Sequence, residues 1–135
     1  MNLNHLHLQV SSVERAMAFY ARHFGLWEFM RHGDVVFLRD GAGMDLALAP
    51  ADSPPAMPPW FHFGFRQGSA AAVEALHAAL VAEGAPIAEP LEQDAGFAAF
   101  RCRDPDGYLI EVYWEVQPTG AGAGTRATTP RPGPR

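Results

Sequence analysis

The sequence contains no lysine, and its single cysteine is Cys102. Without lysine, Schiff-base chemistry through an amine side chain is excluded. One cysteine cannot form a disulfide within the chain, and no Cys-x-x-Cys metal-binding pair is present. Such cysteine usage is typical of the reducing cytoplasm. We expect Cys102 to be a small buried group rather than a nucleophile, because it alternates with Arg101 and Arg103 along a strand-like run.

Positive charge is also scarce, since 15 acidic and 10 basic residues give a formal net charge of -5. A nucleic-acid-binding surface requires an excess of positive charge, so we expect no nucleic-acid partner. No apolar run approaches the length of a membrane span, and the N-terminal segment MNLNHLHLQV has no basic region followed by a long apolar stretch. We therefore expect a globular cytoplasmic protein without a membrane partner.

The same order of elements is predicted twice along the chain. Each half begins with a strand-like segment, continues with a serine-capped helix that ends near a glycine, and closes with three short strand-like runs. In the first half, Ser11 and Glu14 have the spacing of a capping box. The expected strands are 4–10, 27–31, 35–39, 44–49, 60–66, 86–90, 97–103 and 108–114, and the expected helices are 11–24 and 69–83.

A proline-rich segment, PADSPPAMPP, separates the two halves and predicts an extended linker. We accordingly expect a single domain over 1–117, with module one at 1–50, the linker at 51–59 and module two at 60–117. Residues 118–135 consist largely of Gly, Pro and Thr and have too few apolar side chains to bury, so this tail is predicted to be disordered.

Histidines and carboxylates occupy matching places in the two halves. His5 and His7 lie two apart in a strand-like segment, so both should point to one face. His62 opens the second half as His5 opens the first. Asp45 near the end of the first half matches Glu111 near the end of the second. Core packing does not require this arrangement, whereas a binding site would.

Three segments, NHLHLQVSSVERAMAFYARHFGL, HFGF and FRCRDPDGYLIEVYW, occur in this order. Together they resemble the vicinal oxygen chelate superfamily, which includes glyoxalase I, fosfomycin-modifying enzymes, extradiol dioxygenases and bleomycin-binding proteins. The resemblance covers roughly 2–116. It implies an α+β fold in which two βαβββ modules form an incomplete mixed-sheet barrel, glyoxalase-like, around a divalent metal. It also implies His5, His62 and Glu111 as the metal ligands.

Two imidazoles and a carboxylate suit one Fe, Mn, Ni or Zn ion per site and leave coordination positions open for substrate or water. Asp45 is a possible fourth ligand, because glyoxalase I uses a second carboxylate at this place. Aspartate reaches one methylene less far than glutamate, and a strand-start aspartate after a glycine turn is an equally good interpretation. The sequence leaves both alternatives open.

Four further residues are candidates for roles around the metal. His7 should share a face with His5 and could act in acid–base catalysis, and Tyr113 should share a face with Glu111 and could donate a hydrogen bond to substrate. Simple cavity lining is the alternative for both. Arg66, which alternates with His62 and Gly64, and Trp60, which could stack on a planar ligand, are candidate substrate-binding residues.

The resemblance implies a divalent-metal-dependent enzyme that binds a small oxygen-rich substrate bidentately. Its chemistry would be that of a glyoxalase-like lyase or isomerase, or of an extradiol-type dioxygenase. The alternative is a metal-independent small-molecule binding protein of the bleomycin-resistance type. A phosphonate substrate is disfavoured because the loop PLEQDAGFAAF contains no Lys, Ser or Arg. The resemblance further suggests an isologous homodimer in which His5 of one chain meets His62 and Glu111 of the other.

Overall fold

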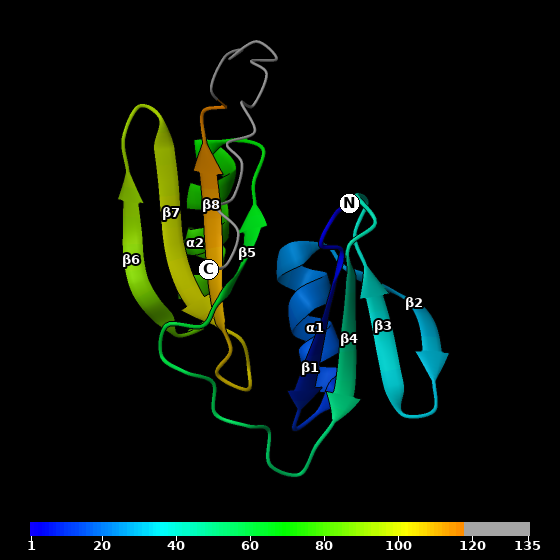
Figure 1. Cartoon of the computed structure of the whole chain (residues 1–135). Coiled ribbons are helices and arrows are strands. Elements are labelled where there is room, and N and C mark those ends of the chain that lie inside the picture. Colours follow the sequence, from blue (N-terminus) through cyan, green and yellow to red (C-terminus); the bar gives the residue numbers. More distant parts are fainter. Residues whose placement is uncertain (118–135) are drawn as a thin grey trace, which may run out of the picture.

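A computed structural model describes residues 1–117, so the tail at 118–135, predicted to be disordered, lies outside the described residues. The βαβββ order expected for each half is confirmed (Figure 1). The elements of the first half are β1 (His5–Val10), α1 (Val13–Phe24), β2 (Trp27–His32), β3 (Val35–Arg39) and β4 (Asp45–Pro50). Those of the second half are β5 (Phe63–Arg66), α2 (Ala70–Ala82), β6 (Ile87–Gln93), β7 (Phe97–Arg103) and β8 (Leu109–Glu115).

Each module is a four-stranded mixed sheet with its own helix. The strand orders are β1-β4-β3-β2 and β5-β8-β7-β6, in which β1/β4 and β5/β8 are parallel and the other pairs are antiparallel. Within 1–117 no strand ladder joins the two sheets, so the barrel is not closed. The α+β fold class is thus confirmed. In Figure 1 the modules stand beside each other, and the segment between β4 and β5 connects them at the lower end of the view.

Strand β1 has the alternation that its sequence predicts. Leu8 and Val10 are buried in the core, whereas His5 and His7 are exposed on the opposite face. The two imidazoles therefore lie on one side of the sheet, as expected from a period of two. The core behind them is made of buried aliphatic side chains from both modules, together with Tyr20 and Phe100.

Two local expectations are wrong. The N-cap of α1 is Ser12, whose side chain accepts a hydrogen bond from the backbone N–H of Arg15, and not Ser11. Ser11 instead donates its hydroxyl to Asp106 of module two at 2.6 Å. The first strand of module two begins at Phe63 rather than at Trp60, because the chain turns before it, with the backbone N–H of Phe61 donating to the carbonyl of Pro58 at 2.9 Å.

A buried carboxylate joins the two modules. Asp104 is 3% exposed, and its Oδ2 accepts a hydrogen bond of 2.8 Å from the hydroxyl of Tyr20 on α1. Its Oδ1 accepts from the backbone N–H groups of Asp106 and Tyr108, each at 2.9 Å. The hydroxyl of Tyr108 donates to the carbonyl of Gln9 on β1 at 2.7 Å. Between the strands expected at 97–103 and 108–114, the sequence indicates no more than a short connection, whereas this connection also fixes module one against module two.

Cys102 is fully buried, which confirms the expectation from its alternation. Burial raises the pKa of its thiol to about 12. Because the thiolate is the reactive form, we expect the folded protein to be inert to a disulfide reagent such as dithionitrobenzoate at neutral pH and to react with one equivalent after denaturation. Rapid reaction of the folded protein would contradict this burial.

None of the helices formed by 1–117 is long and apolar enough to cross a membrane.

Candidate metal centre

His62 and Glu111 form one half of the candidate site, in module two. Glu111 lies on β8 between the fully buried Ile110 and Val112, so its side chain emerges on the opposite face of the sheet. His62 Nε2 lies 3.6 Å from Glu111 Oε2. The other ring nitrogen, Nδ1, is 3.1 Å from the carbonyl oxygen of Trp60. A carbonyl only accepts, so Nδ1 is the donor in this contact, and Nε2 is the ring nitrogen on the side of Glu111 that is available to a metal.

This pair has the chemistry and the spacing of metal ligands. Two donors that bind one metal at about 2.1 Å each lie roughly 3 Å from one another. The 3.6 Å separation of His62 and Glu111 needs only a small adjustment to reach that value. A neutral imidazole nitrogen and a carboxylate oxygen are donors that Fe(II), Mn(II), Ni(II) and Zn(II) accept. The two residues therefore fit a divalent metal.

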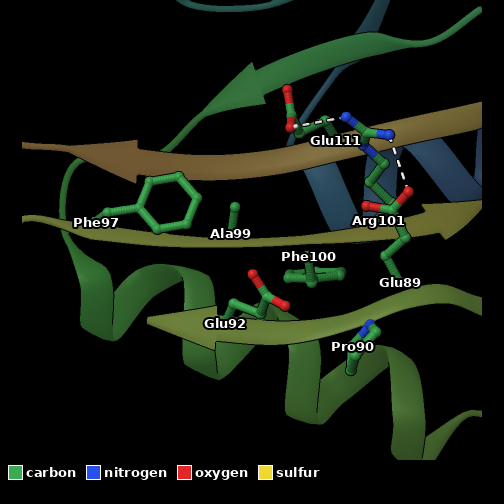
Figure 2. Close-up of a pocket in the computed structure, with 8 residues that line it drawn as sticks. All are labelled: Glu89, Pro90, Glu92, Phe97, Ala99, Phe100, Arg101 and Glu111. Atoms are coloured by element: carbon green, nitrogen blue, oxygen red, sulfur yellow. Dashed lines mark hydrogen bonds and ion pairs between the residues drawn. The ribbon is translucent and has the colours of Figure 1, made fainter. Parts of the chain in front are cut away.

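An arginine lies directly beside Glu111. Arg101 on β7 is the register partner of Glu111, and its guanidinium bridges Glu111 Oε1 at 3.4 Å and Glu89 Oε1 at 2.9 Å (Figure 2). Nothing in the sequence alone sets Arg101 apart from Arg103, which also alternates with Cys102. Pairing β7 and β8 as an antiparallel hairpin would have placed Arg101 beside Glu111. These residues border a cavity of about 240 Å³, lined by Glu89, Pro90, Glu92, Phe97, Ala99, Phe100, Arg101 and Glu111.

The other half of the candidate site is in module one. His5 is the register partner of Asp45, and both line a cavity of about 350 Å³ together with Asn4, Phe37 and Ala47. Both carboxylate oxygens of Asp45 are engaged, since Arg39 donates from Nε to Oδ1 at 2.6 Å and from Nη2 to Oδ2 at 2.9 Å. These hydrogen bonds hold the pKa of Asp45 below its ordinary value. The guanidinium of Arg39 in turn lies 3.8 Å over the ring of Phe29.

The strand registers show which residue of module one corresponds to Glu111. His5 and His62 correspond, because the helix N-caps Ser12 and Ser69 each follow them by seven residues. Glu111 pairs with Gly64, two residues past His62. In module one, the residue two past His5 is His7, and it pairs with Ala47. Asp45 pairs with His5 itself. A methyl group therefore occupies the place that corresponds to Glu111, and the sequence match of Asp45 with Glu111 is displaced by two residues.

The two halves of the site do not meet within one chain. Strands β1 and β5 belong to different modules and run in opposite directions in Figure 1. Their N-terminal ends therefore lie toward opposite ends of the view. Over 1–117, no group of three or more His, Cys, Asp or Glu side chains is close enough to hold a metal. The structure thus brings His62 to Glu111 and His5 to Asp45, but it does not bring His5 to the other two predicted ligands.

The remaining candidates lie in different settings. His7 is exposed on the face of His5, and Tyr113 lies on the face of Glu111, where a methyl group added at Gly64 would be 3.5 Å from the ring. Arg66 is tied to Glu115, with Nη1 donating to the carboxylate at 3.0 Å and Nη2 to the carbonyl at 2.6 Å. Trp60 is 74% exposed in a turn and lines neither of the two cavities.

A family model described as Glyoxalase/Bleomycin resistance protein/Dioxygenase superfamily matches residues 2–112. The chain belongs to this superfamily. A superfamily relative, a manganese-dependent 2,3-dihydroxybiphenyl 1,2-dioxygenase from Geobacillus genomosp. 3, is 30% identical over 128 residues. That match covers 91% of this chain but only 39% of the dioxygenase.

Solved structures of the superfamily agree with the fold. The structure of a possible glyoxalase from Bacillus cereus has 32% identity and a TM-score of 0.73, covering 83% of this chain and 97% of that chain. The fosfomycin resistance protein FosX from Listeria monocytogenes has the same TM-score at 21% identity, covering 86% and 94%. The second likeness concerns the fold alone. The family expected from the three sequence segments is thus confirmed.

Proposed function

We propose that the protein is a divalent-metal-dependent enzyme whose small substrate binds the metal through two adjacent oxygens, and that its reaction is of the dioxygenase type. The observation that carries the proposal is the facing pair of His62 Nε2 and Glu111 Oε2, with the imidazole oriented by the Trp60 carbonyl. His5 would complete a set of two histidines and one carboxylate. The similarity to a manganese-dependent dioxygenase favours Mn(II) or Fe(II) among the candidate metals.

The number of protein ligands favours a dioxygenase-type reaction over a glyoxalase I-like one. A glyoxalase I-like site would need a second carboxylate, but Asp45 is held through both oxygens by Arg39, and Ala47 stands at the position corresponding to Glu111. Three protein ligands leave more coordination positions open than four do. A substrate that chelates through two oxygens, together with dioxygen, needs those positions.

We propose that the active unit is a homodimer with shared sites. Within 1–117 of one chain, His5 is separated from His62 and Glu111, and in the proposed dimer a second copy would supply the third ligand. In an isologous dimer, the module-one cavity of one chain faces the module-two cavity of the other, and the symmetry produces two equal sites. The histidine face of β1, which is exposed in a single chain, would then be covered.

When bound, a divalent metal would supply Lewis-acid chemistry to the substrate oxygens. The side chains around the metal would accept a proton from the substrate, hold the substrate and exclude water. His7, on the face of His5, would accept the proton of a substrate hydroxyl on an imidazole nitrogen. Tyr113 would donate its hydroxyl proton in a hydrogen bond to a substrate oxygen. Phe37 and Phe97, which line the two cavities, would exclude water and hold the apolar part of the substrate.

The direct test is the metal content of purified wild-type protein beside two variants. We expect about one manganese or iron ion per chain in the wild type and in Asp45→Asn, and almost none in His62→Ala, because three ligands are required and Asp45 is not among them. Inductively coupled plasma mass spectrometry measures this.

Two outcomes would overturn parts of the proposal. Wild-type protein that binds no metal even after reconstitution would favour a metal-independent small-molecule binding protein of the bleomycin-resistance type. Loss of metal from Asp45→Asn as complete as from His62→Ala would assign a fourth ligand and favour a glyoxalase-like lyase or isomerase.

A further inference from the structure

The charges around the two cavities are balanced or negative. The cation that lines the module-two cavity is Arg101, and it already contacts two carboxylates, Glu89 at 2.9 Å and Glu111 at 3.4 Å. Glu92 adds a third carboxylate to the lining, and in the described part of the chain it has no ion-pair partner. This cavity therefore carries an excess of negative charge before any metal is bound.

The module-one cavity supplies no compensating cation. Its carboxylate, Asp45, is in a two-point ion pair with Arg39, so that pair is neutral as a whole. The other residues that line this cavity are Asn4, His5, Phe37 and Ala47, and His5 must be neutral to bind a metal. A metal with one carboxylate ligand would leave one positive charge, which a chelating substrate neutralises by losing a proton.

Apolar side chains occupy the rest of the lining. Phe97, Phe100, Pro90 and Ala99 line the module-two cavity, and Phe97 is 38% exposed. An anionic group placed on this surface would lose water, and the cation it would meet, Arg101, is already paired with Glu89 and Glu111. Burying an unpaired charge is costly, and like charges nearby add to that cost.

We propose, on the basis of the function proposed above, that the module-two cavity selects substrates that carry no charge away from the metal-chelating oxygens. Glu89 and Glu92 act as specificity-determining residues that exclude analogues bearing a carboxylate, phosphonate or other anion away from the chelating oxygens. Glu89 does so in two ways, since it repels the anion and also neutralises Arg101, the cation that would otherwise bind it.

The test compares two probes that differ in charge and little else. 3,4-Dihydroxybenzamide and 3,4-dihydroxybenzoate share a ring and two adjacent hydroxyls, but only the second carries an anion on the far side of the ring. Isothermal titration calorimetry of the zinc-loaded protein measures their dissociation constants without turnover. We expect the wild type to bind the amide at least about tenfold more tightly, because like-charge contact opposes the carboxylate.

The variants assign the discrimination to the two glutamates. In the double variant Glu89→Gln/Glu92→Gln, the two dissociation constants should come within about threefold of each other, mainly through tighter binding of the benzoate to Arg101. Glu74→Gln, which removes one carboxylate from an exposed position on α2 that lines neither cavity, is the control and should keep the wild-type ratio.

The possible failures are distinguishable. Equal or tighter binding of the benzoate by the wild type would overturn the charge selection and leave the proposed metal enzyme intact, as would an unchanged ratio in the double variant. A zinc-loaded protein that binds neither probe would overturn the proposed chelation of adjacent oxygens, and the charge selection with it.

Discussion

Mixing the His5→Ala and Glu111→Ala variants is expected to restore metal binding and activity that each variant alone has lost. If sites are shared between chains, a mixed dimer has one intact site, formed by His5 of the Glu111→Ala chain with His62 and Glu111 of the other chain. Random pairing of equal amounts makes half of the dimers mixed, so about a quarter of the wild-type sites should return. Metal content and turnover of the re-equilibrated mixture measure this recovery.

The control for this experiment comes from the same module. His62 and Glu111 face each other at 3.6 Å within one chain, so no pairing of a His62→Ala chain with a Glu111→Ala chain can assemble all three ligands. That mixture should show no recovery. If the His5→Ala and Glu111→Ala mixture also stays empty, although native mass spectrometry detects mixed dimers, the shared site is excluded.

The repeat in the sequence was sufficient to predict the order of the elements, and the resemblance to the superfamily implied their arrangement in mixed sheets. Alternation of apolar and polar residues, helix capping and proline placement are local signals, and they located each strand and helix to within a few residues. The exceptions were also local. Ser11 has the capping-box spacing, yet Ser12 caps α1 because Ser11 bonds to Asp106, far along the chain. A contact of that range leaves no local signal in a single sequence.

The details of the site depend on strand register, which sequence reasoning could not supply. Asp45 matched Glu111 by position at the end of each half, but the loops before β4 and β8 differ, and the ladders pair Asp45 with His5 and Glu111 with Gly64. The antiparallel ladders β3/β4 and β7/β8 bring Arg39 to Asp45 and Arg101 to Glu111. The charge balance of both cavities follows from these two cross-strand pairs. It could therefore be worked out only from the strand pairing in the structure.

Asp104→Ala is expected to lower the free energy of unfolding by about 3–4 kcal/mol, because it leaves several buried donors without an acceptor. The Tyr20 hydroxyl loses its partner, as do the backbone N–H groups of Asp106 and Tyr108, and all three bonds lie at the contact between the modules. Urea denaturation followed by circular dichroism measures the change. A loss below about 1 kcal/mol would mean that water replaces the carboxylate and that this contact does not hold the modules together.

Asp104→Asn separates the hydrogen bonds from the charge. The amide oxygen can still accept from both backbone N–H groups, and its nitrogen can donate to Tyr20, so we expect most of the stability to remain. Burial is the main cause that raises the pKa of Asp104, so its folded form takes up a proton more readily than the unfolded chain does. The contribution of the carboxyl is therefore greatest below its unfolded pKa of about 3.9 and declines as pH rises through the folded value. Measured from pH 4 upward, the stability of the wild type relative to Asp104→Asn should fall. A relative stability that rises with pH would mean that the hydrogen bonds to the ionised carboxylate outweigh its burial.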